Sequence, residues 1–540
     1  MSEPMRADAA RAPPDRWIST PHLAPDHRGP IELPLISFPD PAHAPPIADL
    51  LRHAVEQHPD RTAFEYAGLG LTFTELWSAV QRLAGAIAGH GGSSPVGILL
   101  PAGIHYPVAV FACLVAGRIS LLLDAHYPPT RNREIASEAG AGLIVAEASV
   151  RRSDWPGVEL ITPDADAAAS ADGAPFDPDA VAFLMSTSGS AGRPKLIAHS
   201  QRTMLHWVRT LIHAMHVAPS DRVLSVSSPS SLGGFTSLLT FPLAGSASQM
   251  FEIKEAGLGG LIQTLAERPV TILRAAPPLL RALAQHPRLA RPAMAGLRIV
   301  QTYGEPLLKG DVAAIRPLLP ACCRIRTTYG STEGSGLSWF AGDPDEHDPV
   351  RVATGVLMPD TRALIVDEQD RACGPGREGE LIVASRYNAL GEWRNGAMVP
   401  GALEPDPEEP RVRLFRTGDV ARCSSEGVFV VVGRKDRMAK INAQRVEPAE
   451  VEAAMRALPG VERAEIVIER FTARDRLVAF VVAAPDAGAD LTDDLRRALE
   501  TRLPGFMVPS RIVVVDSIPL LAGGKVDSTA LLDRLRADEC

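Results

Sequence analysis

Several features that mark special classes of protein are missing or scarce in this sequence of 540 residues. Its six cysteines include no C-x-x-C pair, which disfavours a disulfide framework and predicts reduced thiols in a cytoplasmic protein. The N-terminus has no apolar run behind a basic start, so no signal peptide is expected. The most apolar helical stretch, residues 106–117, is shorter than the ~20 residues that span a bilayer, so no membrane partner is expected.

An excess of positive charge is missing as well. The formal net charge is −9, from 64 acidic and 55 basic side chains, whereas a protein that binds nucleic acid usually presents a basic surface. We therefore expect no nucleic-acid partner. Hydrophobic residues make up 46% and charged residues 22% of the chain, which excludes global disorder, a collagen-like rod and a coiled coil. The length corresponds to roughly three to four units of ordinary domain size.

Proline is concentrated at the start of the chain, where residues 1–46 contain 11 prolines. This density prevents helix formation and most sheet pairing, because proline lacks the backbone N–H and fixes φ. We predict an arm that is either disordered or laid on the surface. Four side chains are able to fix part of it: Trp17, Ile31, Leu33 and Phe38.

Apolar strands alternate with helical patterns from Ile47 to about residue 330. The segment Thr72-Phe-Thr-Glu75 has the spacing of a capping box, which predicts a helix that begins there. Strands expected at 96–100 and 119–123 flank a helix expected at 104–116. Strand, helix and strand joined by short turns predict a parallel sheet with helical crossovers.

The pattern changes near residue 400. Residues 400–411 are acidic and rich in proline, and we expect them to form a solvated loop. After Asp436 the sequence predicts a small α+β domain, with helices at 448–458 and 491–502 around apolar strands. The expected domains are a Pro-rich arm, a large domain and a small C-terminal domain, at 1–46, 47–435 and 436–540.

Two segments carry groups suited to phosphate and metal chemistry. STSGSAGRPK (186–195) follows an apolar strand and combines hydroxyls, glycine amides and a lysine, all donors to phosphate oxygens, although it is not a Walker A loop. TYGSTE (328–333) places an aromatic ring, a hydroxyl and a carboxylate after a strand, where open α/β sheets bind ligands. A ring can stack on a purine and a carboxylate can hold Mg²⁺. The structural alternative for the first segment is a flexible turn, and the alternative for the second is a turn with a solvated glutamate.

Two shorter motifs follow. RTGD (416–419) precedes GRKD (433–436), and an aspartate near a nucleotide commonly accepts hydrogen bonds from ribose hydroxyls. GGKVD (523–527) places a lysine on a glycine-rich turn near the C-terminus. Taken alone, the first motif is only a turn signal and the second is typical of a surface turn.

In this order the motifs resemble those of the adenylate-forming (ANL) superfamily, which holds acyl-CoA synthetases, nonribosomal peptide synthetase adenylation domains and firefly-type luciferases. The resemblance covers residues 47–533 and also includes GRKDRMAKINAQRVEPAEVE (433–452) and LPGFMVP (503–509). Residues 114–131 and 445–452 are most similar to the peptide-synthetase branch. The resemblance implies an α/β fold: a large N-terminal domain of layered α/β sheets with a β-rich subdomain, and a small mobile C-terminal α+β domain.

The resemblance also implies an activity. Such an AMP-forming acid–thiol ligase uses ATP and Mg²⁺ to convert a carboxylic acid to acyl-AMP and pyrophosphate. It then passes the acyl group to the phosphopantetheine thiol of a separate carrier protein, here in secondary metabolism. One alternative is an acyl-CoA synthetase that uses free CoA. A non-catalytic adenylate-binding paralogue is a lesser alternative, because such a protein is expected to lose Lys525, Glu333 or Asp419 and all three are present.

Residue roles follow from the matching motifs. The catalytic residues implied are Lys525, Thr332 and Glu333, with Glu333 as the Mg²⁺ ligand. The nucleotide and phosphate contacts implied are Thr187, Ser188, Gly189, Ser190, Gly192, Lys195, Gly304, Glu305, Tyr329, Asp419 and Arg434. Asp436 aligns with the hinge before the small domain. The acid pocket is expected to include Ser230, Leu232, Gly233, Tyr303 and Gly330.

Several positions depart from the family pattern. Leu196 and Ala443 stand where glycine is usual, and the methyl group of Ala443 would tighten the pantetheine channel. Gln201 stands where histidine is frequent, and nearby His199 is expected to be an ordinary surface or capping residue. Residues 225–251 carry no charged side chain to hold an α-ammonium group, which favours an acid with an uncharged tail over an α-amino acid.

Overall fold

The computed structural model describes most of the chain, and the described residues form two compact units. The first unit takes its residues from 1–124, 136–185 and 196–435, and the second from 125–135, 186–195 and 436–540. The residues described are 17–19, 34–165, 177–187, 194–341, 347–349, 351–399, 403–435, 439–442, 444–470, 475–485, 487–488, 490–519 and 526–537.

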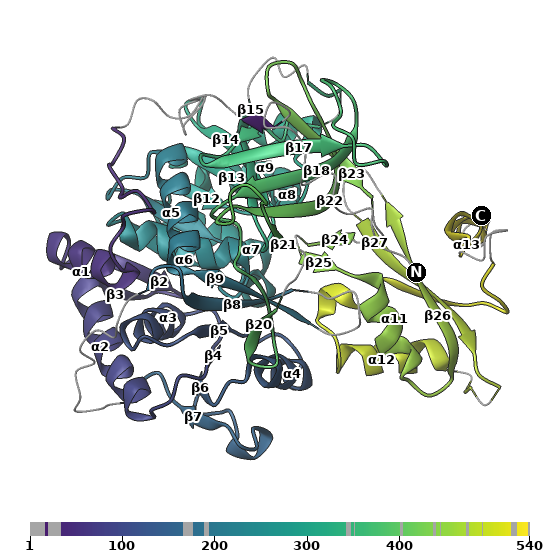
Figure 1. Ribbon diagram of the computed structural model, residues 1–540, viewed down its shortest axis with the longest axis horizontal. Coiled ribbons are helices and arrows are strands. Elements are labelled where there is room, and N and C mark those ends of the chain that lie inside the picture. The colour runs from purple at the N-terminus through teal and green to yellow at the C-terminus, as the bar shows by residue number, and fades with distance from the viewer. Residues whose placement is uncertain are drawn as a thin grey trace. The chain divides into compact units, whose positions relative to one another are not determined.

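The first unit contains three sheets (Figure 1). Among the described residues, one sheet has nine strands in the order β16-β15-β14-β13-β12-β10-β11-β2-β3, and its neighbours from β14 to β2 run parallel. Its strands are β2 (Thr62–Tyr66), β3 (Leu69–Thr72), β10 (Arg222–Ser225), β11 (Ala247–Met250), β12 (Ile272–Arg274), β13 (Ile299–Tyr303), β14 (Arg324–Gly330), β15 (Ser335–Ala341) and β16 (Val356–Leu357).

A second sheet has eight described strands in the order β20-β19-β9-β8-β5-β4-β6-β7. The parallel pairs of β4 with β5 and β6 confirm the expected crossover pattern. Its strands are β4 (Val96–Leu99), β5 (Ser120–Leu122), β6 (Leu143–Ala146), β7 (Glu159–Ile161), β8 (Val181–Thr187), β9 (Lys195–Ser200), β19 (Gly391–Arg394) and β20 (Ala397–Val399).

The third sheet forms a β-rich part of the first unit, with neighbours that pair antiparallel throughout its described strands. Together with the layered α/β sheets, it confirms the fold class expected from the sequence. Its strands are β1 (Ile18–Ser19), β17 (Thr361–Val366), β18 (Gly379–Ser385), β21 (Leu403–Pro405), β22 (Arg413–Cys423) and β23 (Phe429–Arg434).

The helices follow local sequence signals. The helix after Thr72 begins with the expected capping box, because Thr72 Oγ1 accepts from the Glu75 N–H at 3.2 Å and Glu75 Oε2 accepts from the Thr72 N–H at 2.8 Å. The helices up to residue 320 are α1 (Ile47–Gln57), α2 (Phe73–Gly89), α3 (His105–Val115), α4 (Pro129–Ala139), α5 (Gln201–Met215), α6 (Leu232–Leu243), α7 (Ile253–Glu267), α8 (Pro277–Ala284), α9 (Pro287–Ala293) and α10 (Lys309–Ile315), with short 3₁₀ turns at Arg152–Asp154 and Arg316–Leu318.

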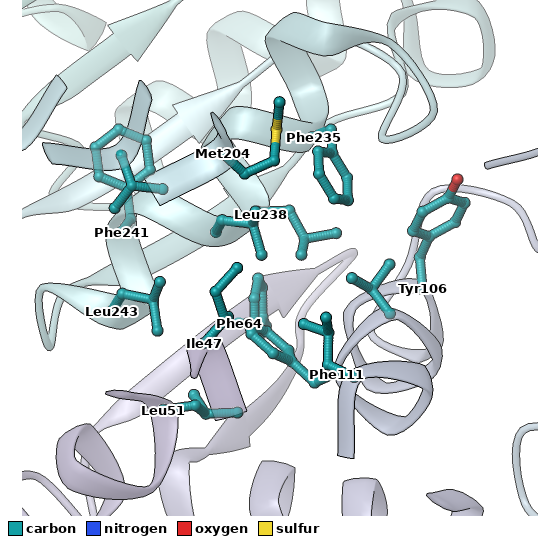
Figure 2. Close-up of a cluster of buried hydrophobic side chains, with 14 of the residues drawn as sticks. Ile47, Leu51, Phe64, Tyr106, Phe111, Met204, Phe235, Leu238, Phe241 and Leu243 are labelled. Carbon is teal, nitrogen blue, oxygen red and sulfur yellow. The ribbon is translucent and has the colours of Figure 1, made fainter. Parts of the chain in front are cut away.

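The largest hydrophobic core joins residues of the nine-stranded and eight-stranded sheets with helices between them. Figure 2 shows part of this core, where Phe235 and Leu238 of α6 point toward Phe64 and Phe111. Burial of each large apolar side chain stabilises the fold by about 1.5–3 kcal/mol. This core fixes α6 against one face of the nine-stranded sheet.

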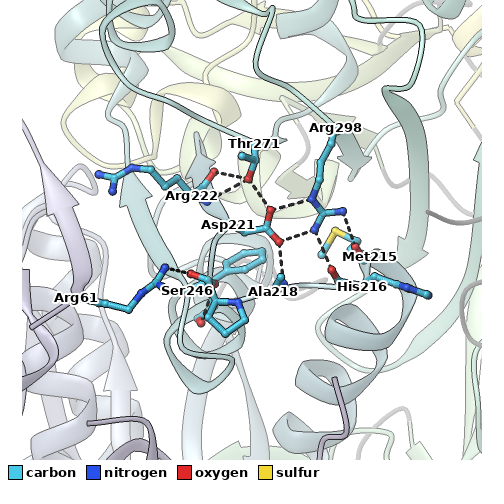
Figure 3. A network of polar contacts seen from close by, with 11 residues as sticks. Arg61, Met215, His216, Ala218, Asp221, Arg222, Ser246, Thr271 and Arg298 are labelled. Atoms are coloured by element: carbon cyan, nitrogen blue, oxygen red, sulfur yellow. Dashed lines mark hydrogen bonds and ion pairs between the residues drawn. The ribbon is translucent and has the colours of Figure 1, made fainter. Parts of the chain in front are cut away.

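A polar network ties the amino ends of strands in the same sheet (Figure 3). Asp221 is 3% exposed and accepts hydrogen bonds from Arg298 Nε at 2.8 Å, Thr271 Oγ1 at 2.7 Å and the Ala218 N–H at 2.8 Å. Arg298 also donates to the carbonyl oxygens of Met215 and His216, at 2.9 and 3.0 Å. The buried aspartate and the arginine therefore satisfy each other and the chain around them.

The acidic segment and part of the proline-rich arm are structured. The expected loop at 400–411 is wrong in part, because β21 pairs with β22 and Leu403 is 9% exposed in a small apolar cluster. In the arm, Ile18 of β1 pairs with Ala363 of β17, and Phe38 is buried. Ile31 and Leu33 lie outside the described residues.

The second unit contains a sheet of β26, β27 and β28, with a core between the sheet and helices α11 and α12. Its elements are β24 (Ala439–Ile441), β25 (Gln444–Val446), α11 (Pro448–Arg456), β26 (Val461–Arg470), β27 (Asp475–Ala483), α12 (Leu491–Glu500), a 3₁₀ turn at Gly505–Met507, β28 (Arg511–Val514) and α13 (Ser528–Ala537).

Two further observations concern the whole described chain. Five of the six cysteines are free thiols, and Cys540 lies outside the described residues. Nowhere in the described ranges is a helix both long enough and apolar enough to cross a bilayer.

Candidate active site

Three of the predicted nucleotide contacts meet in one cluster. Tyr329 Oη donates to Asp419 Oδ2 at 2.5 Å, and Arg434 Nη1 donates to Asp419 Oδ1 at 2.5 Å. Asp419 on β22 lies opposite Arg434 on β23, so the sheet register brings the RTGD and GRKD motifs together. The side chains of Arg434 and Asp419 are 9% and 7% exposed, which makes this a buried, charge-assisted contact.

Local structure holds Asp419 in place. Thr417 Oγ1 accepts from the Asp419 N–H at 3.0 Å and donates to the Leu381 carbonyl at 2.8 Å. Burial, and then the charge of Asp419, raise the pKa of Tyr329 well above its usual value. The Tyr329 hydroxyl therefore stays protonated and remains a hydrogen-bond donor.

Glu333 lies in the tight turn between β14 and β15. The backbone of Ser331 and Gly334 closes this turn with two hydrogen bonds of 2.9 and 3.2 Å. Glu333 is 4% exposed, whereas Thr332 beside it is half-buried. The turn thus presents a buried carboxylate and a hydroxyl at the carboxyl end of a strand, where ligands of open α/β sheets bind.

His199 lies close to this turn, and the expectation of a surface residue is wrong, because its side chain is 1% exposed. Burial lowers the pKa of His199 to about 4, and the Thr332 backbone and the Glu333 carboxylate oppose that shift only in part. Its Nδ1 lies 3.3 Å from Thr203 Oγ1. The sequence signal for this burial was its place directly after the apolar run 196–198.

Gly304 and Glu305 follow β13. Gly304 has a φ of +85°, which glycine adopts without strain. Glu305 is buried.

The described ends of the expected phosphate loop are the end of β8 and the start of β9. Thr187 Oγ1 is a buried polar atom without a hydrogen-bond partner in the described part of the chain. Lys195 is half-buried at the start of β9. The loop residues Ser188, Gly189, Ser190 and Gly192 lie outside the described residues, as do Asp436, Ala443 and Lys525.

Gly233 is placed where no side chain fits. A Cβ added there would lie 2.5 Å from Cε2 of Tyr303. The Tyr303 hydroxyl lies 2.6 Å from Ser227 Oγ. Gly330 is similarly close to Trp207, with 2.7 Å from an added Cβ to Cη2. The five expected pocket residues thus lie around strand ends and the start of α6.

Sequence reasoning missed two neighbours of this region. Asp124 Oδ2 accepts from the hydroxyls of Ser228 and Ser230, both at 2.9 Å, so the Ser230 hydroxyl already has a partner. Arg274 donates from Nη1 to the Gly233 carbonyl at 3.1 Å, and its guanidinium lies 5.1 Å from the centroid of the Tyr303 ring. An arginine in the apolar run TILRAA was the available signal.

Comparison with known proteins gives two family matches. Residues 51–393 match the family described as AMP-binding enzyme, and residues 450–525 match its C-terminal domain. Phosphinothricin tripeptide synthetase PhsC of Streptomyces viridochromogenes is 32% identical over 92% of this chain and 46% of its own length. Delta-poly-L-ornithine synthetase of Acinetobacter baumannii is 28% identical over 90% of this chain and 36% of its own. The chain thus spans less than half the length of these relatives.

Solved structures share the fold. An o-succinylbenzoate CoA synthetase (MenE) double mutant of Bacillus subtilis is 20% identical with a TM-score of 0.76, over 90% of this chain and 98% of its own. NpsA-ThdA, an artificially fused adenylation–PCP di-domain of Klebsiella oxytoca, is 19% identical with a TM-score of 0.73, over 86% and 93%.

These matches, together with the fold, define an enzyme of the adenylate-forming class that is similar to nonribosomal peptide synthetase adenylation proteins. The chain belongs to the AMP-binding enzyme family.

Proposed function

We propose that the chain activates a carboxylic acid with ATP and transfers the acyl group to the phosphopantetheine thiol of a separate carrier protein in secondary metabolism. The observation that best supports the first step is the Tyr329–Asp419–Arg434 cluster, because it joins three separate motifs into one buried site. Support for the second step comes from similarity to adenylation–PCP proteins. Free CoA is the alternative acceptor.

The residues present fit ATP and Mg²⁺. Asp419, held by Arg434, offers carboxylate oxygens to the ribose hydroxyls, and the Tyr329 ring offers a face to adenine. The buried Thr187 hydroxyl lacks a partner in the described residues, which a phosphate oxygen would supply. No cluster of three candidate metal ligands occurs in the described ranges, but Mg²⁺ needs only one or two carboxylates beside phosphates, and Glu333 supplies one.

Each group then has a task in adenylation. Bound Mg²⁺ would neutralise charge that builds up on the phosphate oxygens. Lys525 would donate to the carboxylate and phosphate oxygens, and the segment 186–195 would hold the leaving phosphates. Asp436 would be the hinge that lets a small domain, 436–540, bring Lys525 to a large domain, 47–435. These assignments follow from the motif matches.

Exchange of pyrophosphate into ATP, measured across a panel of carboxylic acids, tests adenylation. We expect exchange with one class of acid, reduced by ~10²-fold or more in Glu333→Gln, because one positioned electrostatic group has been lost. Glu378→Gln is the matched control, since that side chain is 54% exposed beside Arg422. Nucleotide binding without exchange for any acid would instead identify the non-catalytic paralogue.

The acceptor is tested separately with preformed acyl-AMP. Acyl transfer to a phosphopantetheinylated carrier should be faster than transfer to free CoA. Faster transfer to CoA would identify an acyl-CoA synthetase.

A further inference from the structure

Three polar side chains form a row across neighbouring strands of the nine-stranded sheet. The parallel register pairs Arg274 of β12 with Gln301 of β13, and Gln301 with Arg326 of β14. Residues in register on adjacent strands share a face of the sheet. This face is the one on which Ile272 and Ile299 pack in the large hydrophobic core.

The row is buried but incompletely paired. Arg326 and Gln301 are 0% exposed and Arg274 is 3% exposed. Within the described residues, Nε and Nη2 of Arg326, Nε of Arg274 and Oε1 of Gln301 have no hydrogen-bond partner. Their remaining contacts are to neutral groups: Arg326 Nη1 donates to Thr328 Oγ1 at 2.7 Å, and Arg274 donates to the Gly233 carbonyl and the Ser237 hydroxyl.

Two such cations on the strands that flank β13 are costly. Burial, and then the charge of Arg274, lower the pKa of Arg326 to about 9. No carboxylate of the described residues forms an ion pair with either guanidinium, in contrast to Arg298 with Asp221. A buried charge without a partner costs several kcal/mol, so an anion from outside the chain would be bound strongly here.

The row also lies next to the expected acid pocket. Two residues further along β13 and β14, and therefore on the same face, Tyr303 pairs with Thr328. Arg274 contacts Tyr303 and Gly233, two of the five expected pocket residues. Along this face of β13 the side chains therefore change from apolar Ile299, through Gln301, to Tyr303 at the pocket.

We propose that Arg326 and Arg274, with Gln301, bind a second carboxylate at the far end of the acid that this chain activates, so that the substrate is a dicarboxylic acid. The proposal rests on the adenylation function proposed above. The sequence favoured an uncharged tail because residues 225–251 hold no charge. The arginines come from strands outside that segment, and planar guanidinium groups match a carboxylate through paired hydrogen bonds.

The test uses the full chain and pairs of acids that differ only in tail charge. Succinate, glutarate, adipate and terephthalate are compared with their monoamides in pyrophosphate exchange. The same acids without ATP are compared by the shift that they cause in the melting temperature. We expect at least one dicarboxylate to exceed its monoamide by ~10-fold or more in kcat/KM, the value of a charged hydrogen bond.

Two substitutions identify the residues responsible. Arg326→Met should bring the ratio of dicarboxylate to monoamide close to one, and Arg274→Met should lower it. Arg222→Met is the matched control: this arginine lies in the same sheet but is paired with Glu65 at 2.5 Å, so the ratio should not change. If Arg326→Met does not fold, the ratio in Gln301→Leu, which removes a neutral group of the row, is measured instead and should fall.

The outcomes separate the two proposals. A monoamide that equals or exceeds every dicarboxylate, or a ratio unchanged by Arg326→Met, overturns the dicarboxylate proposal and leaves adenylation standing. No exchange with any acid, but a thermal shift by dicarboxylates that Arg326→Met abolishes, overturns adenylation and keeps the anion site. Absence of both exchange and thermal shift overturns both.

Discussion

Two buried arginine sites in one sheet differ in whether the positive charge has a carboxylate partner. Before β13, Arg298 meets Asp221, and the pair is completed by Thr271 and by backbone groups (Figure 3). On β14, Arg326 is more deeply buried, yet two of its nitrogens have no partner among the described residues. The first site lies at the amino ends of the strands, whereas the second crosses the sheet from Arg274 at the end of β12 to Arg326 near the start of β14. The comparison indicates that the first site stabilises the fold, and the missing partners of the second support the proposal that it binds an anion.

The largest expected effect comes from removing the negative charge that pairs with Arg298. Asp221→Asn leaves Arg298 buried without its counter-charge and should lower the free energy of unfolding by about 3–5 kcal/mol. Denaturant unfolding measures the loss. Pyrophosphate exchange per folded molecule should stay unchanged.

Asp494→Asn is the matched control, because Asp494 is 65% exposed in an ion pair with Arg497 on the protein surface. Its stability should hardly change. If the Asp221→Asn protein were as stable as this control, the pair of Arg298 and Asp221 would not stabilise the fold.

The second effect concerns catalysis rather than stability. Lys525→Ala should slow acyl-AMP formation by at least ~10²-fold, because one donor to the transition state is lost. Thiolysis of preformed acyl-AMP should be largely intact. Single-turnover rates of the two half-reactions measure this, and equal losses in both would contradict the role assigned to Lys525.

The third effect concerns His199, a buried group that stays uncharged, in contrast to the two buried arginines. The pKa of His199 is lowered to about 4 from an unfolded value near 6.5, so the unfolded chain binds a proton first as the pH falls. Stability linked to His199 is therefore complete above pH 6.5 and is lost as the pH falls toward 4.

Between pH 7 and pH 5 the native protein should lose about 2 kcal/mol more unfolding free energy than His199→Gln. Denaturant unfolding at both pH values measures the difference. Equal losses in the native protein and His199→Gln would show that His199 is not held neutral.

Much of the framework was predictable from local signals. The capping box at Thr72, the crossover from β4 to β5 and the helices of the C-terminal unit depend on spacing that short segments carry. The motifs also identified Asp419 and Arg434, although only the register of β22 with β23 shows that they form a pair.

The remaining features depend on contacts between distant segments. Leu403 becomes buried because β21 pairs with β22, which the acidic composition of its segment hides. The side chains of Arg274 and Arg326 are 52 positions apart in sequence and share a face only through strand register. Conversely, His199 appears polar in sequence but lies in a strand whose neighbours exclude water.

The most direct test of the contrast between the two sites is the unfolding free energy of Arg326→Met measured beside that of Asp221→Asn. Without an added acid, Arg326→Met should be as stable as the native protein or more stable, because an uncompensated buried charge has been removed. Asp221→Asn should be much less stable. A loss in Arg326→Met as large as that in Asp221→Asn would show that both arginines stabilise the fold, and it would contradict the account.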